Sequence, residues 1–332
     1  MTIPSRHCAM LLGALLLSAP ASIRAQGETP PTNIDSLTAI LDSPNTDSRA
    51  RAVSALGTLD PSLLPHGTRM KLIALLERAA TRPAVPREPD GQDTGEGENQ
   101  MDLVWVVLRL QDPAATRALA LGGITVDAAS QRFVASQGDA ALPFLIEAER
   151  IHTIDDGSVT ITRAYMLGEF GSRLSPQGRV VTLAAILRTA VAEPTTFAEA
   201  AKLGGIVTAV PLLQQIAANA PSGRTKTMLL NALDSLVDMR SQTPVPGIVS
   251  SLALTLDALC SGAQGARLGA CQAMRNELDN AKNHIVAGRP IPARHTLDAL
   301  SKRAADAVRQ GALEPWEGTL VSGTATYLKT RI

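Results

Sequence analysis

Residues 268–285, which read LGACQAMRNELDNAKNHI, carry the clearest structural pattern in this sequence. The apolar residues of this stretch recur at steps of three and four, and charged side chains fill positions between them, as in an amphipathic helix. The apolar positions are Leu268, Cys271, Met274, Leu278, Ala281 and Ile285. Because they share one face of the helix, a neighbouring helix must cover them.

The same spacing recurs over residues 228–237 and 297–308, so helices dominate the pattern. Strand signals are few: residues 158–162 and 321–328 alternate weakly, and their Ala-rich surroundings favour helix in both cases. Asp47 is the expected N-cap of a helix that ends at Gly57. The sequence therefore predicts an all-α protein.

The first 25 residues have the three parts of a secretory signal peptide. Arg6 gives a positive start, residues 9–19 form a short apolar core, and Ala25 ends the expected cleavage site, with Ala21 as an alternative. The apolar core is too short to span a bilayer, and Cys8 precedes it, so we expect neither a membrane span nor a lipid anchor. We predict an exported protein, periplasmic or extracellular.

Composition narrows the choice of partners. Cleavage after Ala25 leaves 29 basic and 31 acidic residues, a net charge of −2, which is not the basic balance of a nucleic-acid-binding protein. Aromatic residues make up 2% of the chain, which argues against surfaces that stack bases or sugars. We expect no nucleic-acid partner.

Two cysteines follow the signal peptide, Cys260 and Cys271. An even pair in an exported protein favours a disulfide, which would close a loop of about ten residues. The alternative is a zinc site that also uses His284 and His295, but these spacings match no common ligand pattern. We therefore predict the disulfide, with no metal and no cofactor.

Residues 81–100 interrupt the helical pattern. This segment is rich in Pro, Gly and acidic residues, and it cannot bury enough apolar surface to offset the entropy of ordering it. We expect a disordered loop between helices. Its carboxylates lack the dense alternation of a calcium-binding EF-hand loop.

Internal repetition is faint. The string Leu-Gly-Gly-Ile occurs at residues 121–124 and again at 203–206, an offset of 82 residues, about twice the period of HEAT-type helix pairs. Residues 37–41, followed by Asp47-Ser-Arg-Ala-Arg-Ala-Val-Ser-Ala-Leu-Gly57, resemble a HEAT unit, whose second helix carries an Arg followed by Ala and a closing Leu-Gly. Echoes of this pattern occur at 141–145 with 163–168, and at 209–213 with the helix from Thr225.

The resemblance implies a HEAT-like α-solenoid of antiparallel helix pairs. Residues 26–80 and 101–245 would form the helix pairs, and residues 246–332 a C-terminal helical cap with helices at 248–260, 268–286 and 295–310. Residues 270–281, with Gly288 and the amphipathic helix after it, resemble small helical modules at the ends of exported bacterial proteins. The HEAT family has no shared catalytic residues, so none is transferred.

No catalytic motif stands out. The nucleophile elbow, the HExxH zinc motif and the phosphate-binding loop are absent from the sequence, and we expect Trp105 to pack in the core and Trp316 on the cap. His152 beside Asp155 and Asp156 is read as part of a turn.

The expected function is a non-catalytic scaffold that binds a protein or peptide on a concave face. The alternatives are an enzyme or enzyme accessory with a groove site, or a structural envelope component.

Overall fold

The computed structural model describes residues 33–81, 96–151 and 157–332 of this chain. These residues form sixteen α-helices and five short 3-10 helices, with no strand among them, which confirms the all-α prediction. The predicted signal peptide (1–25), most of the predicted acidic loop and the His152, Asp155 and Asp156 group lie outside the described residues.

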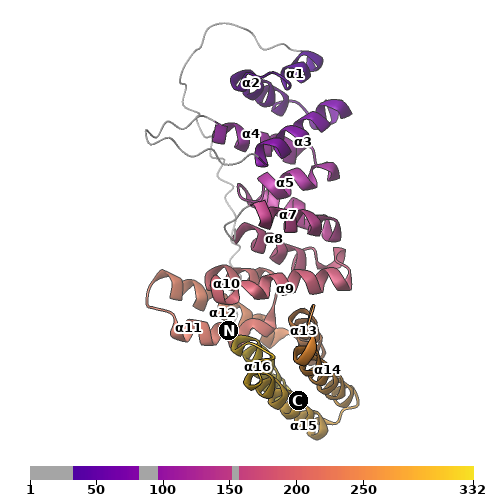
Figure 1. The fold of residues 1–332 in the computed structure, drawn as a ribbon, viewed down its shortest axis with the longest axis vertical. Helices are drawn as coiled ribbons and strands as arrows, with labels where there is room; N and C mark the ends of the chain where they lie inside the picture. Colours follow the sequence, from indigo (N-terminus) through magenta and orange to yellow (C-terminus); the bar gives the residue numbers. More distant parts are fainter. Residues whose placement is uncertain (1–32, 82–95, 152–156) are drawn as a thin grey trace, which may run out of the picture.

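The first eight helices stack along the long axis of the molecule (Figure 1). The even-numbered helices α2, α4, α6 and α8 contact one another in succession and form one layer, while α3, α5 and α7 form a second layer beside it. The bounds are α1 (Ile34–Ile40), α2 (Thr46–Gly57), α3 (His66–Ala80), α4 (Glu96–Arg109), α5 (Thr116–Gly122), α6 (Ala128–Ser136), α7 (Leu142–Ile151) and α8 (Gly157–Leu167).

A 3-10 turn leads from each even-numbered helix of the stack into the next odd-numbered one. In the first two turns the aspartates Asp60 and Asp112 precede a proline, and each carboxylate accepts the backbone N–H two residues on. The same local chemistry therefore reverses the chain at the same place in successive helix pairs. The turns are η1 (Pro61–Leu63), η2 (Pro113–Ala115), η3 (Gly138–Ala141), η4 (Gly171–Arg173) and η5 (Val207–Ala209).

The remaining helices extend the stack and then fold back on it. Helices α10 and α12 continue the even-numbered layer, α13 packs on α9, and α14, α15 and α16 pack side by side, with α16 returning to α11 and α13. The bounds are α9 (Pro176–Ala192), α10 (Pro194–Leu203), α11 (Val210–Asn219), α12 (Arg224–Gln242), α13 (Val245–Leu259), α14 (Gly265–Val286), α15 (Pro290–Arg309) and α16 (Pro315–Arg331).

The C-terminal region thus has a fourth helix, α16, beyond the three that the sequence indicated. Residues 321–328 lie in α16 and not in a strand, as their composition favours. Helix α16 contacts α11, α13 and α15, so it needs apolar residues on more than one side. Its sequence therefore shows no clear division into an apolar face and a polar face.

Two hydrophobic cores divide the described residues. The N-terminal core runs from Leu37 to Leu174, and the C-terminal core runs from Ala164 to Leu328, with α8 contributing to both. The expected start of a separate cap at residue 246 falls inside α13, where the C-terminal core is continuous. We call residues 33–174 and 175–332 the N-terminal half and the C-terminal half.

Three local expectations are corrected. Helix α4 begins at Glu96, so the last five residues of the predicted loop are helical. The cap of α2 is Asn45, whose side chain accepts the N–H of Ser48, and Asp47 lies in the first turn of the helix. Trp105 is 45% exposed and does not pack in the core as expected. The apolar run 103–110 covers all sides of helix α4, but only one side of that helix is buried, and Trp105 lies on another side.

Candidate functional site

A groove lies where the stack meets the helices that fold back on it. Its main hollow has a volume of about 570 Å³ and is walled by α9, α13 and α14, with α13 next to both of the others (Figure 1). A smaller hollow of about 210 Å³ shares Arg179, Ser251 and Leu254 with it and extends toward the ends of α8 and α10. The two hollows together form the candidate binding groove.

The floor of the groove is apolar and its rim is polar. Val180 on α9 with Ala253 and Leu254 on α13 supply partly exposed apolar surface, and the buried core residues Val249 and Leu278 lie beneath it. These residues belong to three helices whose other faces are committed to the C-terminal core. The polar residues around them are Gln177, Arg179, Ser250, Ser251, Asp257, Asp279 and Lys282.

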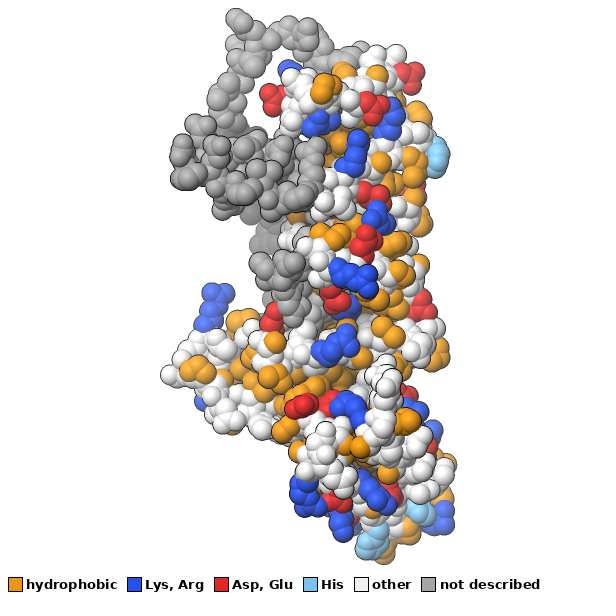
Figure 2. Space-filling model, viewed as in Figure 1, with side chains coloured by type: hydrophobic (Ala, Val, Ile, Leu, Met, Phe, Trp, Pro, Cys, Tyr) orange, Lys and Arg blue, Asp and Glu red, His pale blue; other side chains and the backbone are white. Residues whose placement is uncertain are grey.

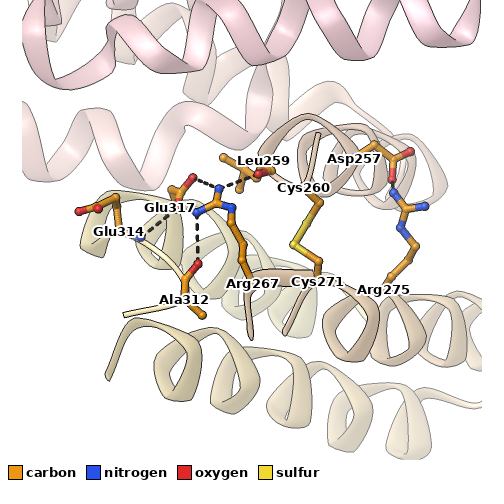
Figure 3. The surroundings of a disulfide bond; sticks show 9 residues. All are labelled: Asp257, Leu259, Cys260, Arg267, Cys271, Arg275, Ala312, Glu314 and Glu317. Carbon is orange, nitrogen blue, oxygen red and sulfur yellow. Dashed lines mark hydrogen bonds and ion pairs between the residues drawn. A yellow bond between two sulfur atoms is a disulfide. The ribbon is translucent and has the colours of Figure 1, made fainter. Parts of the chain in front are cut away.

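The charged side chains of the rim differ in how they are paired. Asp257 forms an ion pair with Arg275 on α14, which is visible in Figure 3. Arg179 donates from Nε to the carbonyl oxygen of Gly171 at 3.1 Å and has no carboxylate within ion-pair distance among the described residues. Its terminal guanidinium nitrogens are therefore available to an acidic group on a ligand.

The last three residues of the second Leu-Gly-Gly-Ile string, residues 204–206, line the smaller hollow. There Gly205 has a φ of 62°, and the N–H of Ile206 donates to the carbonyl of Ala201 at 2.9 Å. In the first string the N–H of Ile124 likewise donates to the carbonyl oxygen five residues earlier, that of Leu119, at 3.0 Å. The two helix ends share this hydrogen bond but differ in backbone conformation, because Gly123, the counterpart of Gly205, has a φ of −99°. Only the second end opens into the groove.

A disulfide holds two walls of the groove together. Cys260 follows the last residue of α13 and Cys271 lies in α14, and the two sulfur atoms are bonded, as the sequence predicts (Figure 3). Cys271 is in the second turn of α14, because that helix begins at Gly265, three residues before the expected start at residue 268.

A charged cluster beside the disulfide fixes the same helix ends. Arg267 donates two hydrogen bonds to the carboxylate oxygens of Glu317 in a bidentate contact, at 2.6 and 2.9 Å. It also donates to the carbonyl oxygen of Leu259 at 2.6 Å. Glu317 is 6% exposed and also accepts the N–H of Glu314. The hydrogen bonds to Glu317 raise the pKa of Arg267, so the guanidinium stays charged.

The alternative metal ligands are not brought together. His284 lies thirteen residues after Cys271 on α14, about 20 Å along the helix axis. His295 is exposed on α15. Among residues 33–81, 96–151 and 157–332 no three His, Cys, Asp or Glu side chains are grouped as a metal site requires.

Trp316 is half-buried and packs against the C-terminal core.

The groove itself was not predicted from the sequence. Its walls come from segments about 30 to 100 residues apart, and Arg179 stands in no motif.

No helix of the described part combines the length and hydrophobicity that crossing a membrane requires. Comparisons of this chain with protein-family models, with curated proteins and with solved structures find no match.

Proposed function

We propose that this chain is an exported, non-catalytic HEAT-like scaffold that binds a peptide segment of a protein partner in the groove between α9, α13 and α14. The observation that carries the proposal is the groove, with an apolar floor and an arginine that has no acidic partner in the part of the chain that the structure describes. An extended or helical segment with an apolar side chain next to a carboxylate matches this surface.

The glycines that close two of the HEAT-like units support the fold assignment. A Cβ placed on Gly57 would lie 2.6 Å from Cγ2 of Val106 on α4, the next helix of the even-numbered layer. A Cβ on Gly168 would overlap the carbonyl oxygen of Leu203, at the end of α10. The Leu-Gly that ends each unit thus coincides with a close approach of successive helices, as expected for stacked repeats.

Two features support export. The N-terminal pattern has the order of a secretory signal, with Arg6 before the apolar residues 9–19 and small residues up to Ala25. The Cys260–Cys271 disulfide is of a kind that persists in oxidising compartments outside the cytosol.

Site-specific photo-cross-linking tests the groove. A photo-reactive amino acid is placed at Ser250, exposed on α13 in the groove, and in a second variant at Thr326, exposed on α16 and outside it. Each protein is produced in its native host with its signal segment and irradiated in the cell envelope fraction. We expect a partner cross-linked from Ser250 and not from Thr326.

Two substitutions sharpen the test. Arg179→Ala removes the unpaired arginine of the rim and Gln177→Glu adds a negative charge that repels a carboxylate, and both positions are exposed, so the fold is retained. Circular dichroism checks that retention. The cross-link from Ser250 should be lost in both variants and kept in Arg188→Ala, which changes an exposed arginine of α9 that does not line the groove. Equal cross-linking from Ser250 and Thr326 would remove the groove from the proposal.

A further inference from the structure

The turn between α14 and α15 presents two apolar side chains to solvent. Val286, the last residue of α14, is 77% exposed, and Ile291, the second residue of α15, is 67% exposed. No side chain of the cores covers them, although the rest of both helices buries a regular stripe. We call residues 282–295 the hairpin tip.

The hairpin tip has a defined shape. Gly288 has a φ of 65°, and the N–H of Arg289 donates to the carbonyl of His284 at 2.9 Å, which closes the end of α14. Pro290 then starts α15 with a fixed backbone angle. Val286 and Ile291 are therefore held on either side of a tight turn at the end of two long helices.

Cations surround these apolar side chains. Lys282, Arg289 and Arg294 are exposed on the tip, with His284 and His295 beside them. The sequence has no Asp or Glu from residue 280 to residue 297. In Figure 2 the lower end of the molecule accordingly shows Lys, Arg and His side chains with hydrophobic atoms between them.

The nearest carboxylates along the two helices lie about two turns from the turn and do not neutralise the tip. Asp298 on α15 is paired with Lys329 of α16. Asp279 lies on the rim of the groove, before Lys282. The tip therefore keeps an excess of positive charge around an exposed apolar apex.

We propose that the hairpin tip binds the surface of an anionic lipid bilayer, with Val286 and Ile291 inserted among the lipids and the three cations on the headgroups. Apolar side chains surrounded by Lys and Arg are the arrangement that interfacial binding requires. A nucleic acid would contact the same cations but would gain nothing from two exposed aliphatic side chains. This surface shares Lys282 with the rim of the groove, but Val286, Arg289, Ile291 and Arg294 lie outside it.

Vesicle sedimentation tests the proposal with residues 26–332, which retain every described residue and omit the apolar segment 9–19. Vesicles of phosphatidylcholine are compared with vesicles of equal parts phosphatidylcholine and phosphatidylglycerol. We expect binding to the anionic vesicles that is at least about tenfold stronger than to the neutral ones. Arg289→Glu with Arg294→Glu should abolish that preference.

Apolar substitutions separate lipid insertion from charge attraction alone. Val286→Ser with Ile291→Ser should weaken binding to anionic vesicles about tenfold, because less apolar surface inserts. The matched control is Val191→Ser on α9, which is 69% exposed and lies outside the tip, and it should bind as the unsubstituted protein does. Equal binding to both vesicle types, or binding unaffected by the double serine change, would overturn the proposal. Binding to a DNA duplex that is lost on charge reversal and unaffected by the serine changes would assign the tip to nucleic acid instead.

Discussion

The two halves of the molecule are built from similar helices but are held together differently. In the N-terminal half, helices contact neighbours one and two places along the chain, and Arg117 links successive helix pairs through half-exposed ion pairs with Glu77 and Glu147. The buried Arg163 forms its ion pair locally, with Glu149 of the preceding helix. In the C-terminal half, α16 returns to α11 and α13, and a disulfide and the buried Glu317 fix the helix ends.

This difference determines how far a local change is felt. Contacts between neighbours confine a disturbance to adjacent helices, as in repeat proteins whose stability is roughly a sum of local terms. In the C-terminal half, contacts from α16 back to residues 208–215 join distant segments into one unit. The hydroxyl of Thr324 donates to the carbonyl oxygen of Thr208, and the hydroxyl of Thr319 donates to the side-chain oxygen of Gln215. We therefore expect the C-terminal half, which holds the groove, to unfold as one cooperative unit.

The largest expected effect comes from the buried carboxylate of the C-terminal half. Glu317→Gln leaves the Arg267 guanidinium without its counter-ion, at an expected cost of about 3 kcal/mol in the free energy of unfolding. The counterpart in the N-terminal half is Glu147→Gln, where the partly exposed pair should contribute at most about 1 kcal/mol. Urea denaturation followed by circular dichroism measures both. Equal losses would contradict the distinction between the halves.

Removing the disulfide should have the next largest effect. Cys260→Ser with Cys271→Ser frees a short loop and should lower the free energy of unfolding by about 2–3 kcal/mol. The loss should appear in the transition of the C-terminal half and leave that of the N-terminal half in place, which a fluorescent label on each half reports. A shift of both transitions by the same amount would show that the cores are coupled.

The close approach of α16 to α11 gives a smaller effect. A Cβ on Gly323 would overlap the ring of Pro211, so Gly323→Ala should cost about 1–3 kcal/mol. Gly269 on α14 has nothing within 4 Å of the same position, and Gly269→Ala should stabilise by about 0.5–1 kcal/mol through its helix propensity. Thermal melting of the two variants should move in opposite directions. A neutral Gly323→Ala would mean that α16 does not return to α11.

The smallest effect is a pH dependence in the N-terminal half. The hydrogen bond from Arg117 lowers the pKa of Glu147 in the folded protein, so the carboxylate contributes stability above its unfolded pKa of about 4.3. That contribution is lost as the pH falls through the lower folded pKa. The difference between the unsubstituted protein and Glu147→Gln, measured by urea denaturation, should therefore be present at neutral pH and disappear in acid. A difference that persists in acid would rule out this carboxylate as its source.

Local patterns predicted much of the fold. The apolar spacing of residues 268–285 predicted α14, which runs from Gly265 to Val286, and the even pair Cys260 and Cys271 in a chain with a signal-like N-terminus predicted their bond. Both features lie within one helix or across one turn. Their prediction needs no knowledge of what packs from elsewhere in the chain.

The features that depend on distant segments were not predicted. Trp105 lies in an apolar run, and only the position of its neighbours decides that it faces outward. Arg267 and Glu317 are fifty residues apart and look like ordinary surface residues of two helices. Arg179 joins the groove because α13 packs on α9, a contact across about 70 residues that no local motif records.

Native-state hydrogen exchange, read by mass spectrometry at increasing urea, tests most directly whether two separate cores organise the molecule. We predict that peptides from α9 to α16 lose protection together, and that those from α1 to α7 lose it in a separate step at a different urea concentration. Reduction of the disulfide should shift only the first group. Loss of protection in all helices at one urea concentration, shifted as a whole by reduction, would contradict the division into two cores.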